Sequence, residues 1–156
     1  MEYNKSRKGA AMKLPEYITK KEVQRVCKEL KIRDWAKLKK ASVLPEEAKT
    51  ILSLVNVENM KIDLKEFATG LEVELEHGVQ FKDANVTNNH PVITGMIVLA
   101  HLKESLDYYK LLDVAEAEGD LLKAVAAGDV AKIKKYYKKV AQTRIVLSQA
   151  AASQVK

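Results

Sequence analysis

Hydrophobic positions along the chain repeat with the period of an α-helix, and no stretch alternates convincingly with the period of a strand. Steps of three and four residues place apolar side chains on one face in three successive segments: Val23, Val26, Cys27 and Leu30; Ala48, Ile51, Leu52 and Val55; Leu64, Phe67, Ala68, Leu71 and Leu75. The pattern therefore predicts an all-α protein, folded as a compact helical bundle of five or six helices.

Local signals predict where several of these helices begin and end. Thr19–Glu22 and Asp63–Glu66 have the spacing of capping boxes, and Pro45 suits a first helical position. Gly78 stands where a helix-ending glycine is expected after a helix over 64–77.

The second half of the chain predicts two longer helices. Pro91 opens the longest, over 91–117, and His90 before it is expected to be a cap or loop residue rather than a ligand. Gly119-Asp120 and Gly128-Asp129 each pair a helix-ending glycine with a helix-capping aspartate. A final basic helix follows over 130–153. Its expected inward residues are Val130, Ile133, Tyr137, Val140 and Ala141.

The length of 156 residues suits one domain. Residues 1–18 show no periodicity, so we expect a flexible N-terminal arm before a single helical domain over 19–156. The one cysteine, Cys27, excludes an intrachain disulfide framework and is expected to be a small core residue. No apolar run reaches the roughly 18 residues of a membrane span, and no secretory signal opens the chain, so the expected location is cytoplasmic, away from membranes.

The net charge of +6 conceals three blocks of alternating sign. Residues 1–62 and 121–156 are each strongly basic, whereas residues 63–120 carry 12 acidic and only 4 basic side chains. Blocks of this kind suit contacts between copies of the chain or with a larger protein assembly. A structural or assembly subunit, including a homo-oligomer, is therefore one functional hypothesis.

The candidate chemistry lies in the acidic block, where polar residues interrupt apolar helical faces. Glu74 and His77 are three residues apart beside the apolar face of one helix, and His101 and Glu104 fall within the apolar stripe of the next. Buried charge is costly unless it is paired or bound to a metal. The most specific hypothesis is therefore a metal-binding bundle, in which these four residues hold one or two ions.

Imidazole and carboxylate ligands suit iron, zinc or manganese. Asp107 and Tyr108 would orient the ligands of such a site. The alternative is a polar network without metal, in which Tyr108, Thr94 and Asn88 supply further partners. The sequence has no phosphate-binding glycine loop, Gly-x-Ser-x-Gly, His-Glu-x-x-His or Cys-x-x-Cys, and no catalytic residue is assigned.

A third hypothesis concerns the basic C-terminal helix. Four of its lysines could contact phosphates of a nucleic acid: Lys132, Lys135, Lys138 and Lys139. A solvated basic face explains the same composition and is favoured over nucleic-acid binding.

The region 63–118 resembles a family of small bacterial, archaeal and phage-encoded proteins known only as a domain of unknown function. The similar segments are FATGLEVELEHG (67–78), NVTNNHP (85–91) and LAHLKESLDYYKLL (99–112). The family's loop usually has an acidic pair where this sequence has Asn89 and His90, so no role passes to His90. The resemblance implies that the two polar pairs belong to one unit, and it implies no activity, cofactor or partner.

Overall fold

The protein is described by a computed structural model that covers residues 15–155, so most of the predicted N-terminal arm lies outside the described residues. In this part of the chain, six α-helices and two 3-10 helices follow one another: α1 (Lys20–Glu29), η1 (Trp35–Lys37), α2 (Pro45–Val55), α3 (Leu64–Gln80), η2 (Lys82–Ala84), α4 (Pro91–Glu104), α5 (Tyr108–Ala126) and α6 (Val130–Gln154). Residues 15–155 contain no strand, so the all-α prediction is confirmed. No helix among them is long and apolar enough to span a bilayer.

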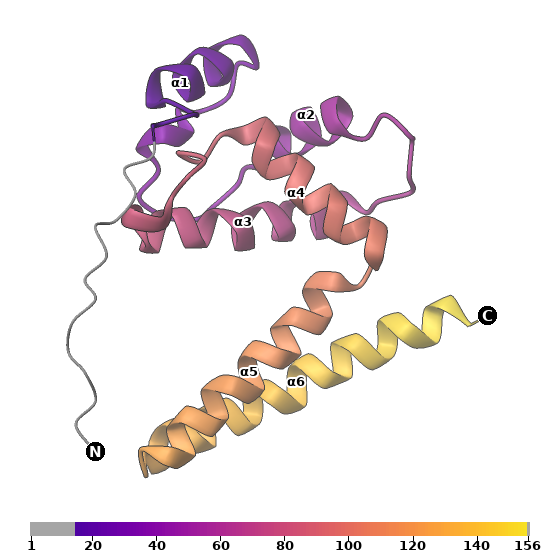
Figure 1. The fold of residues 1–156 in the computed structure, drawn as a ribbon. Coiled ribbons are helices and arrows are strands. Elements are labelled where there is room, and N and C mark those ends of the chain that lie inside the picture. Colours follow the sequence, from indigo (N-terminus) through magenta and orange to yellow (C-terminus); the bar gives the residue numbers. More distant parts are fainter. Residues whose placement is uncertain (1–14, 156) are drawn as a thin grey trace, which may run out of the picture.

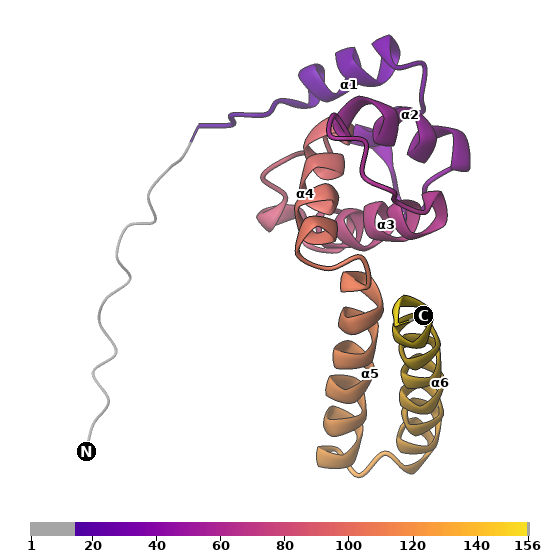
Figure 2. The ribbon, with the colours of Figure 1, turned by 90° about the vertical axis from the view of Figure 1, so that its right-hand side faces the viewer.

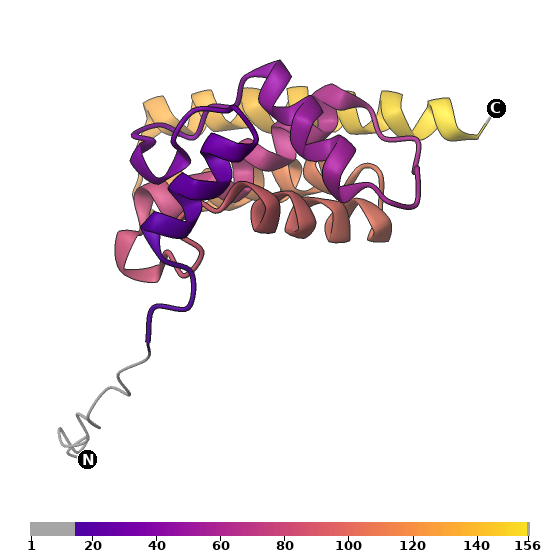
Figure 3. The same cartoon turned by 90° about the horizontal axis from the view of Figure 1, so that it is seen from above.

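The helices form a body and a projecting hairpin (Figures 1 and 2). In the body, α2, α3 and α4 contact one another in all three pairs, and α1 packs against η1 and α4. Helices α5 and α6 run antiparallel along one another and leave the body on one side. Seen from above, α6 passes beneath the body (Figure 3).

The body is held together by one apolar core. It is built from α1, η1, α2, α3 and α4, and its fully buried large side chains include Trp35, Ile51, Phe67, Leu71 and Leu102. Helices α2 and α4 approach closely because position 95 is glycine: a Cβ there would lie 2.4 Å from Cγ2 of Ile51. Cys27 is buried in this core, as predicted.

The predicted helix starts are confirmed by their hydrogen bonds. The Thr19 hydroxyl accepts from the backbone N–H of Glu22, and the Asp63 carboxylate accepts from two N–H groups of the first turn of α3. Asp129 caps α6 in the same way after Gly128, which has a left-handed φ of 66°. These side chains satisfy N–H groups that have no partner within the helix.

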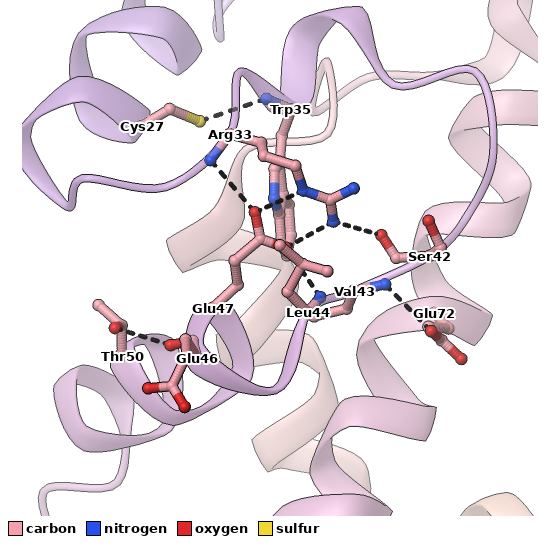
Figure 4. Close-up of polar contacts among 10 residues, drawn as sticks. All are labelled: Cys27, Arg33, Trp35, Ser42, Val43, Leu44, Glu46, Glu47, Thr50 and Glu72. Atoms are coloured by element: carbon pink, nitrogen blue, oxygen red, sulfur yellow. Dashed lines mark hydrogen bonds and ion pairs between the residues drawn. The ribbon is translucent and has the colours of Figure 1, made fainter.

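An ion pair between the partly exposed Arg33 and the buried Glu47 connects the 30–44 segment to the start of α2 (Figure 4). Oε1 of Glu47 accepts from the backbone N–H and the Nε–H of Arg33, and Oε2 accepts from Nη2 of Arg33 at 2.6 Å and from the N–H of Leu44 at 2.9 Å. Every oxygen of this carboxylate therefore has two donors. The same connector is joined to α3 where Glu72 accepts from the N–H of Val43.

The prediction of one helix over 91–117 is wrong, because the helix is interrupted between α4 and α5. Ser105 has the extended dihedrals φ −157° and ψ 130°, and its hydroxyl accepts from the N–H of Asp107. The break turns the chain out of the body and into the hairpin (Figure 1).

Two predicted helix ends are also wrong. Helix α5 continues through Gly119 and Asp120 to Ala126, because Ala117 and Ala124 on either side are buried in the hairpin. Helix α3 continues past Gly78 to Gln80. Gly78 instead makes room for the following loop, since a Cβ there would lie 2.2 Å from Oδ1 of Asn89.

The inward face of α6 is only partly as predicted. Val140 is buried and Ile133 is half-buried, but Val130, Tyr137 and Ala141 are exposed. Tyr136 lies inward instead, because the face that meets α5 steps through residues 133, 136, 140, 143 and 147.

Candidate functional site

Three of the four predicted ligands gather where α3, α4 and α5 meet. Nε2 of His101 lies 3.6 Å from Oε1 of Glu74, and Nδ1 of His101 lies 3.7 Å from Oε2 of Glu104. Glu74 and His101 are largely shielded from solvent, whereas Glu104 is exposed. The structure thus places the polar residues of α3 and α4 against one another.

Two tyrosines of α5 complete this cluster. The ring of Tyr108 stacks on His101 with centroids 4.0 Å apart, and the hydroxyl of Tyr109 donates to Oε1 of Glu74 at 2.9 Å. Burial and the neighbouring Glu74 carboxylate raise the pKa of Tyr109, so its hydroxyl stays protonated as a donor. We call Glu74, His101, Tyr108 and Tyr109 the polar joint, because they connect the hairpin to the body.

The polar joint depends on a glycine in α3. A Cβ at Gly70 would lie 2.5 Å from Cε2 of Tyr109, so only glycine allows this ring to rest on α3. A second connection lies beside it, where Lys110 pairs with Glu66 at 2.7 Å and with Asp107 at 3.3 Å. Asp107 also accepts from the amide of Gln154 near the end of α6.

His77 does not join the other predicted ligands. Its side chain is exposed, and within residues 15–155 no three side chains of His, Cys, Asp or Glu form a group that could hold a metal ion. Asp107 faces Lys110 rather than a histidine, and Thr94 and Asn88 donate to carbonyl oxygens elsewhere. The metal-binding hypothesis is untested and stays a prediction.

His77 instead lines a small pocket of about 150 Å³ between α3 and the loop that follows it. Glu74 and Gly78 border the pocket from α3, the 84–89 segment covers it, and Thr94 and Ile97 border it from α4. We call this cavity the loop pocket. All its lining residues come from the segments that carry the polar pairs and the loop between them.

The loop over the pocket is fixed by its asparagines. Nδ2 of Asn85 donates to the carbonyl of Gly78 and to Oδ1 of Asn89, and Nδ2 of Asn89 donates to the carbonyl of Trp35. Asn88 and Asn89 have left-handed φ angles of 48° and 62°, a conformation that asparagine tolerates better than most residues. Sequence reasoning missed the roles of Asn85 and Asn89, although the density of asparagines in one short loop was a local signal.

The hairpin carries a second candidate surface. A helix turns by about 100° per residue, so residues three, four, seven or eleven apart lie on the same side. One side of α5 carries Leu111, Leu122 and Val125, and one side of α6 carries Val130, Tyr137 and Ile145. The ion pair between Glu118 and Arg144 shows that these two sides form one face. We call the six apolar residues the hairpin apolar face. Leu122, Val130 and Tyr137 are each at least 70% exposed.

The four predicted anion-contacting lysines lie around the first half of α6. Lys132 pairs with Asp129 and Lys139 pairs with Asp113, whereas Lys135 lies over the ring of Tyr136. Lys138 is exposed. The lysines therefore do not form one ridge of free charges, and the nucleic-acid hypothesis stays a prediction.

These features define an all-helical protein whose body carries a polar pocket and whose hairpin carries an exposed apolar face. The chain belongs to the family described as Protein of unknown function (DUF5661), which it matches over residues 23–118. The match begins within α1, covers the rest of the body, the loop pocket and the polar joint, and ends within α5. No curated protein matches the chain, and no solved structure matches it.

Proposed function

We propose that this protein is a non-enzymatic assembly subunit that pairs with a second copy of itself through the hairpin apolar face. The observation that carries the proposal is the exposure of six large apolar side chains on one side of two packed helices. Contiguous apolar surface of this kind marks interaction sites more often than scattered single residues do.

The opposite side of the hairpin supports this choice of face. There, Leu112, Glu116 and Thr143 line a groove of about 390 Å³ that opens toward α3. One side of the hairpin therefore faces the body, and the other side is exposed among the described residues 15–155.

Charge favours a second copy as the partner. Glu118 and Arg144 form an ion pair in the middle of the hairpin apolar face. In a two-fold dimer with antiparallel hairpins, the same patch of both copies forms the interface. Glu118 of each copy can then lie against Arg144 of the other copy. Helix α5 has four acidic and two basic residues, and α6 has six basic residues and no acidic one, so α5 also complements α6 of the partner.

The expected affinity is modest. An apolar strip of roughly 15 residues is about 22 Å long at 1.5 Å per residue. Two such helices bury less surface than the 1,200–2,000 Å² typical of stable complexes, taken as a rough guide. We therefore expect a dissociation constant on the order of 10 µM.

Sedimentation velocity over a range of about 1–200 µM tests this, a span that brackets the expected constant. Wild-type protein should pass from monomer to dimer, and Leu122→Lys should weaken the dimer at least tenfold. The matched control is Val146→Lys, which changes a half-exposed apolar residue on the opposite side of the hairpin. It should leave dimerisation unchanged.

A charge exchange tests the pairing of copies directly. Glu118→Arg and Arg144→Glu should each weaken self-association, because each places like charges at the centre of the interface. Mixing the two variants should produce a heterodimer, in which every charge again meets its opposite. A wild-type protein that is monomeric throughout, or equal disruption by Val146→Lys, would show that the hairpin apolar face serves another partner or none.

A further inference from the structure

We propose that the loop pocket binds a primary alkylammonium group, as found at the end of a lysine side chain or of a polyamine. The inference rests on the body of the protein and is independent of the hairpin apolar face. It starts from a count of donors and acceptors around the cavity.

Several side-chain donors of the pocket lining are already used within the protein. Both described bonds of Asn85 come from its Nδ2 group, the Nδ2 of Asn89 bonds to Trp35, and the Thr94 hydroxyl donates to the carbonyl of His90. The remaining lining donors are on His77, Thr87 and one N–H of Asn89, and a phosphate or carboxylate bound by them would lie beside the Glu74 carboxylate, which repels it.

Acceptors remain available in the same lining. Oε2 of Glu74 and Oδ1 of Asn85 accept no hydrogen bond from any described residue, and each hydroxyl oxygen of Thr87 and Thr94 has a second lone pair. An ammonium group donates three hydrogen bonds and accepts none. The Glu74 carboxylate supplies the opposite charge that a shielded ammonium requires.

The rim of the pocket suits the alkyl chain of such a ligand. Ala84, Val86 and Ile97 line the pocket, and Val86 is 80% exposed on a loop that is otherwise polar. The volume of about 150 Å³ holds an ammonium head and a few methylene groups, since each water in the liquid occupies roughly 30 Å³. The charge of Glu74, the available acceptors and the apolar rim thus agree on one chemical class.

The test is a titration of ¹⁵N-labelled full-length protein with n-butylammonium chloride, followed by NMR. We expect the amide signals of Gly78, Asn85 and Thr87 to shift with a dissociation constant on the order of 1 mM, reasonable for so small a ligand. Butan-1-ol, which lacks the charge, and tetramethylammonium, which lacks N–H groups, should bind at least tenfold more weakly.

Two variants locate the site. Glu74→Gln should weaken butylammonium at least tenfold, whereas Glu76→Gln, on an exposed position of the same helix, should not. Val86→Ser changes only an exposed loop residue, and it should weaken butylammonium about threefold while leaving methylammonium unchanged. This second variant remains informative if Glu74→Gln disturbs the bond to Tyr109.

Two further probes distinguish a protein lysine from a polyamine as the source of the ammonium group. Tighter binding of Nα-acetyl-lysine amide than of 1,4-diaminobutane indicates a protein lysine, and the reverse indicates a polyamine. An absence of shifts at about 50 mM butylammonium, well above the expected constant, overturns the proposal. So does equal binding of tetramethylammonium, or saturation of the pocket by micromolar Zn²⁺ or Mn²⁺, which would instead support the predicted metal site.

Discussion

Glu47 is a charged side chain that is only 3% exposed. Burial raises the pKa of Glu47, but the hydrogen bonds from Arg33 and Leu44 outweigh burial and hold this pKa below its ordinary value of 4.5. The carboxylate therefore stabilises the fold only while it is ionised and paired.

We expect Glu47→Gln to lower the free energy of unfolding by about 2 kcal/mol at pH 7, because a neutral amide replaces the charged acceptor of four hydrogen bonds, while the partly exposed Arg33 guanidinium stays solvated. A group whose pKa is depressed by folding stabilises the protein above its unfolded pKa and loses that effect as the pH falls through the folded pKa. The difference from wild type should therefore shrink below about pH 4.5. Urea denaturation at several pH values measures it, with the exposed neighbour Glu46→Gln as the control.

His90 should cause a loss of stability at mildly acidic pH. Its Nδ1 accepts from the N–H of Ile93 and caps α4, which only an unprotonated nitrogen can do. Burial lowers the pKa of His90 from 6.5, although Glu22 opposes this effect. Stability is thus complete above about pH 6.5 and falls as the pH drops through the lower folded pKa.

Thermal unfolding between pH 7.5 and pH 5 should show this decline in the wild type and a flatter profile in His90→Asn, since asparagine caps without titrating over that range. His77→Asn replaces an exposed histidine and should retain the wild-type slope. An identical slope in His90→Asn would mean that another group causes the acid sensitivity.

At the residue scale, local sequence identified the caps at Thr19, Asp63 and Asp129 correctly, because a cap and the N–H group it binds are within three residues of each other. The roles of Tyr109 and Asn89 were not predictable in the same way. Their partners, Glu74 and Trp35, are 35 and 54 residues away, and no periodicity encodes such contacts.

At the scale of elements, Gly70 and Gly119 occupy helix interiors for different reasons. A Cβ at Gly70 would meet Tyr109 and Val98 at 2.5 and 2.6 Å, whereas a Cβ at Gly119 meets nothing within 4 Å. Alanine gains about 1 kcal/mol over glycine in an unobstructed helix. The two positions therefore form a matched pair.

Gly70→Ala should destabilise the protein by about 1–3 kcal/mol, because overpacking outweighs the gain in helix propensity. Gly119→Ala should stabilise it by up to about 1 kcal/mol. Chemical denaturation of both variants measures these changes. The packing argument fails if Gly70→Ala is neutral and leaves the fluorescence of the tyrosines unchanged.

The interruption between α4 and α5 could not be predicted from hydrophobic periodicity. The residues on either side continue one apolar stripe, and no glycine or proline interrupts them, so periodicity favours a continuous helix. Ser105 and Asp107 are residues that often begin helices, which was the only local signal of a break. The turn itself is decided by Tyr109, which reaches Glu74 and Gly70 only when α5 leaves the direction of α4.

For the whole molecule, body and hairpin differ in how they are supported. The body has one shared core, whereas within residues 15–155 the hairpin is held mainly by the packing of α5 on α6. Elements with few buried contacts open locally at lower free energy than the core. Native-state hydrogen exchange should therefore show greater protection for the buried segments of α2, α3 and α4 than for residues 117–140.

Hydrogen exchange measured in low concentrations of denaturant gives the free energy of opening for each part. Protection in the body should converge on the free energy of global unfolding, and the hairpin tip should open below it. Uniform protection across both parts would mean that they unfold as one unit. Repeating the measurement at high protein concentration should raise protection in the hairpin alone if copies pair there.

The short interruption at residues 105–107 also acts as a pivot between the body and the hairpin. Helix α5 has 19 residues and extends about 28 Å from that pivot. A rotation of only about 10° at the pivot would carry the far end of the hairpin roughly 5 Å, about one helical turn. The side chains that fix the pivot angle, Tyr109 on Glu74 and Lys110 on Glu66, therefore set the position of a surface that they do not touch.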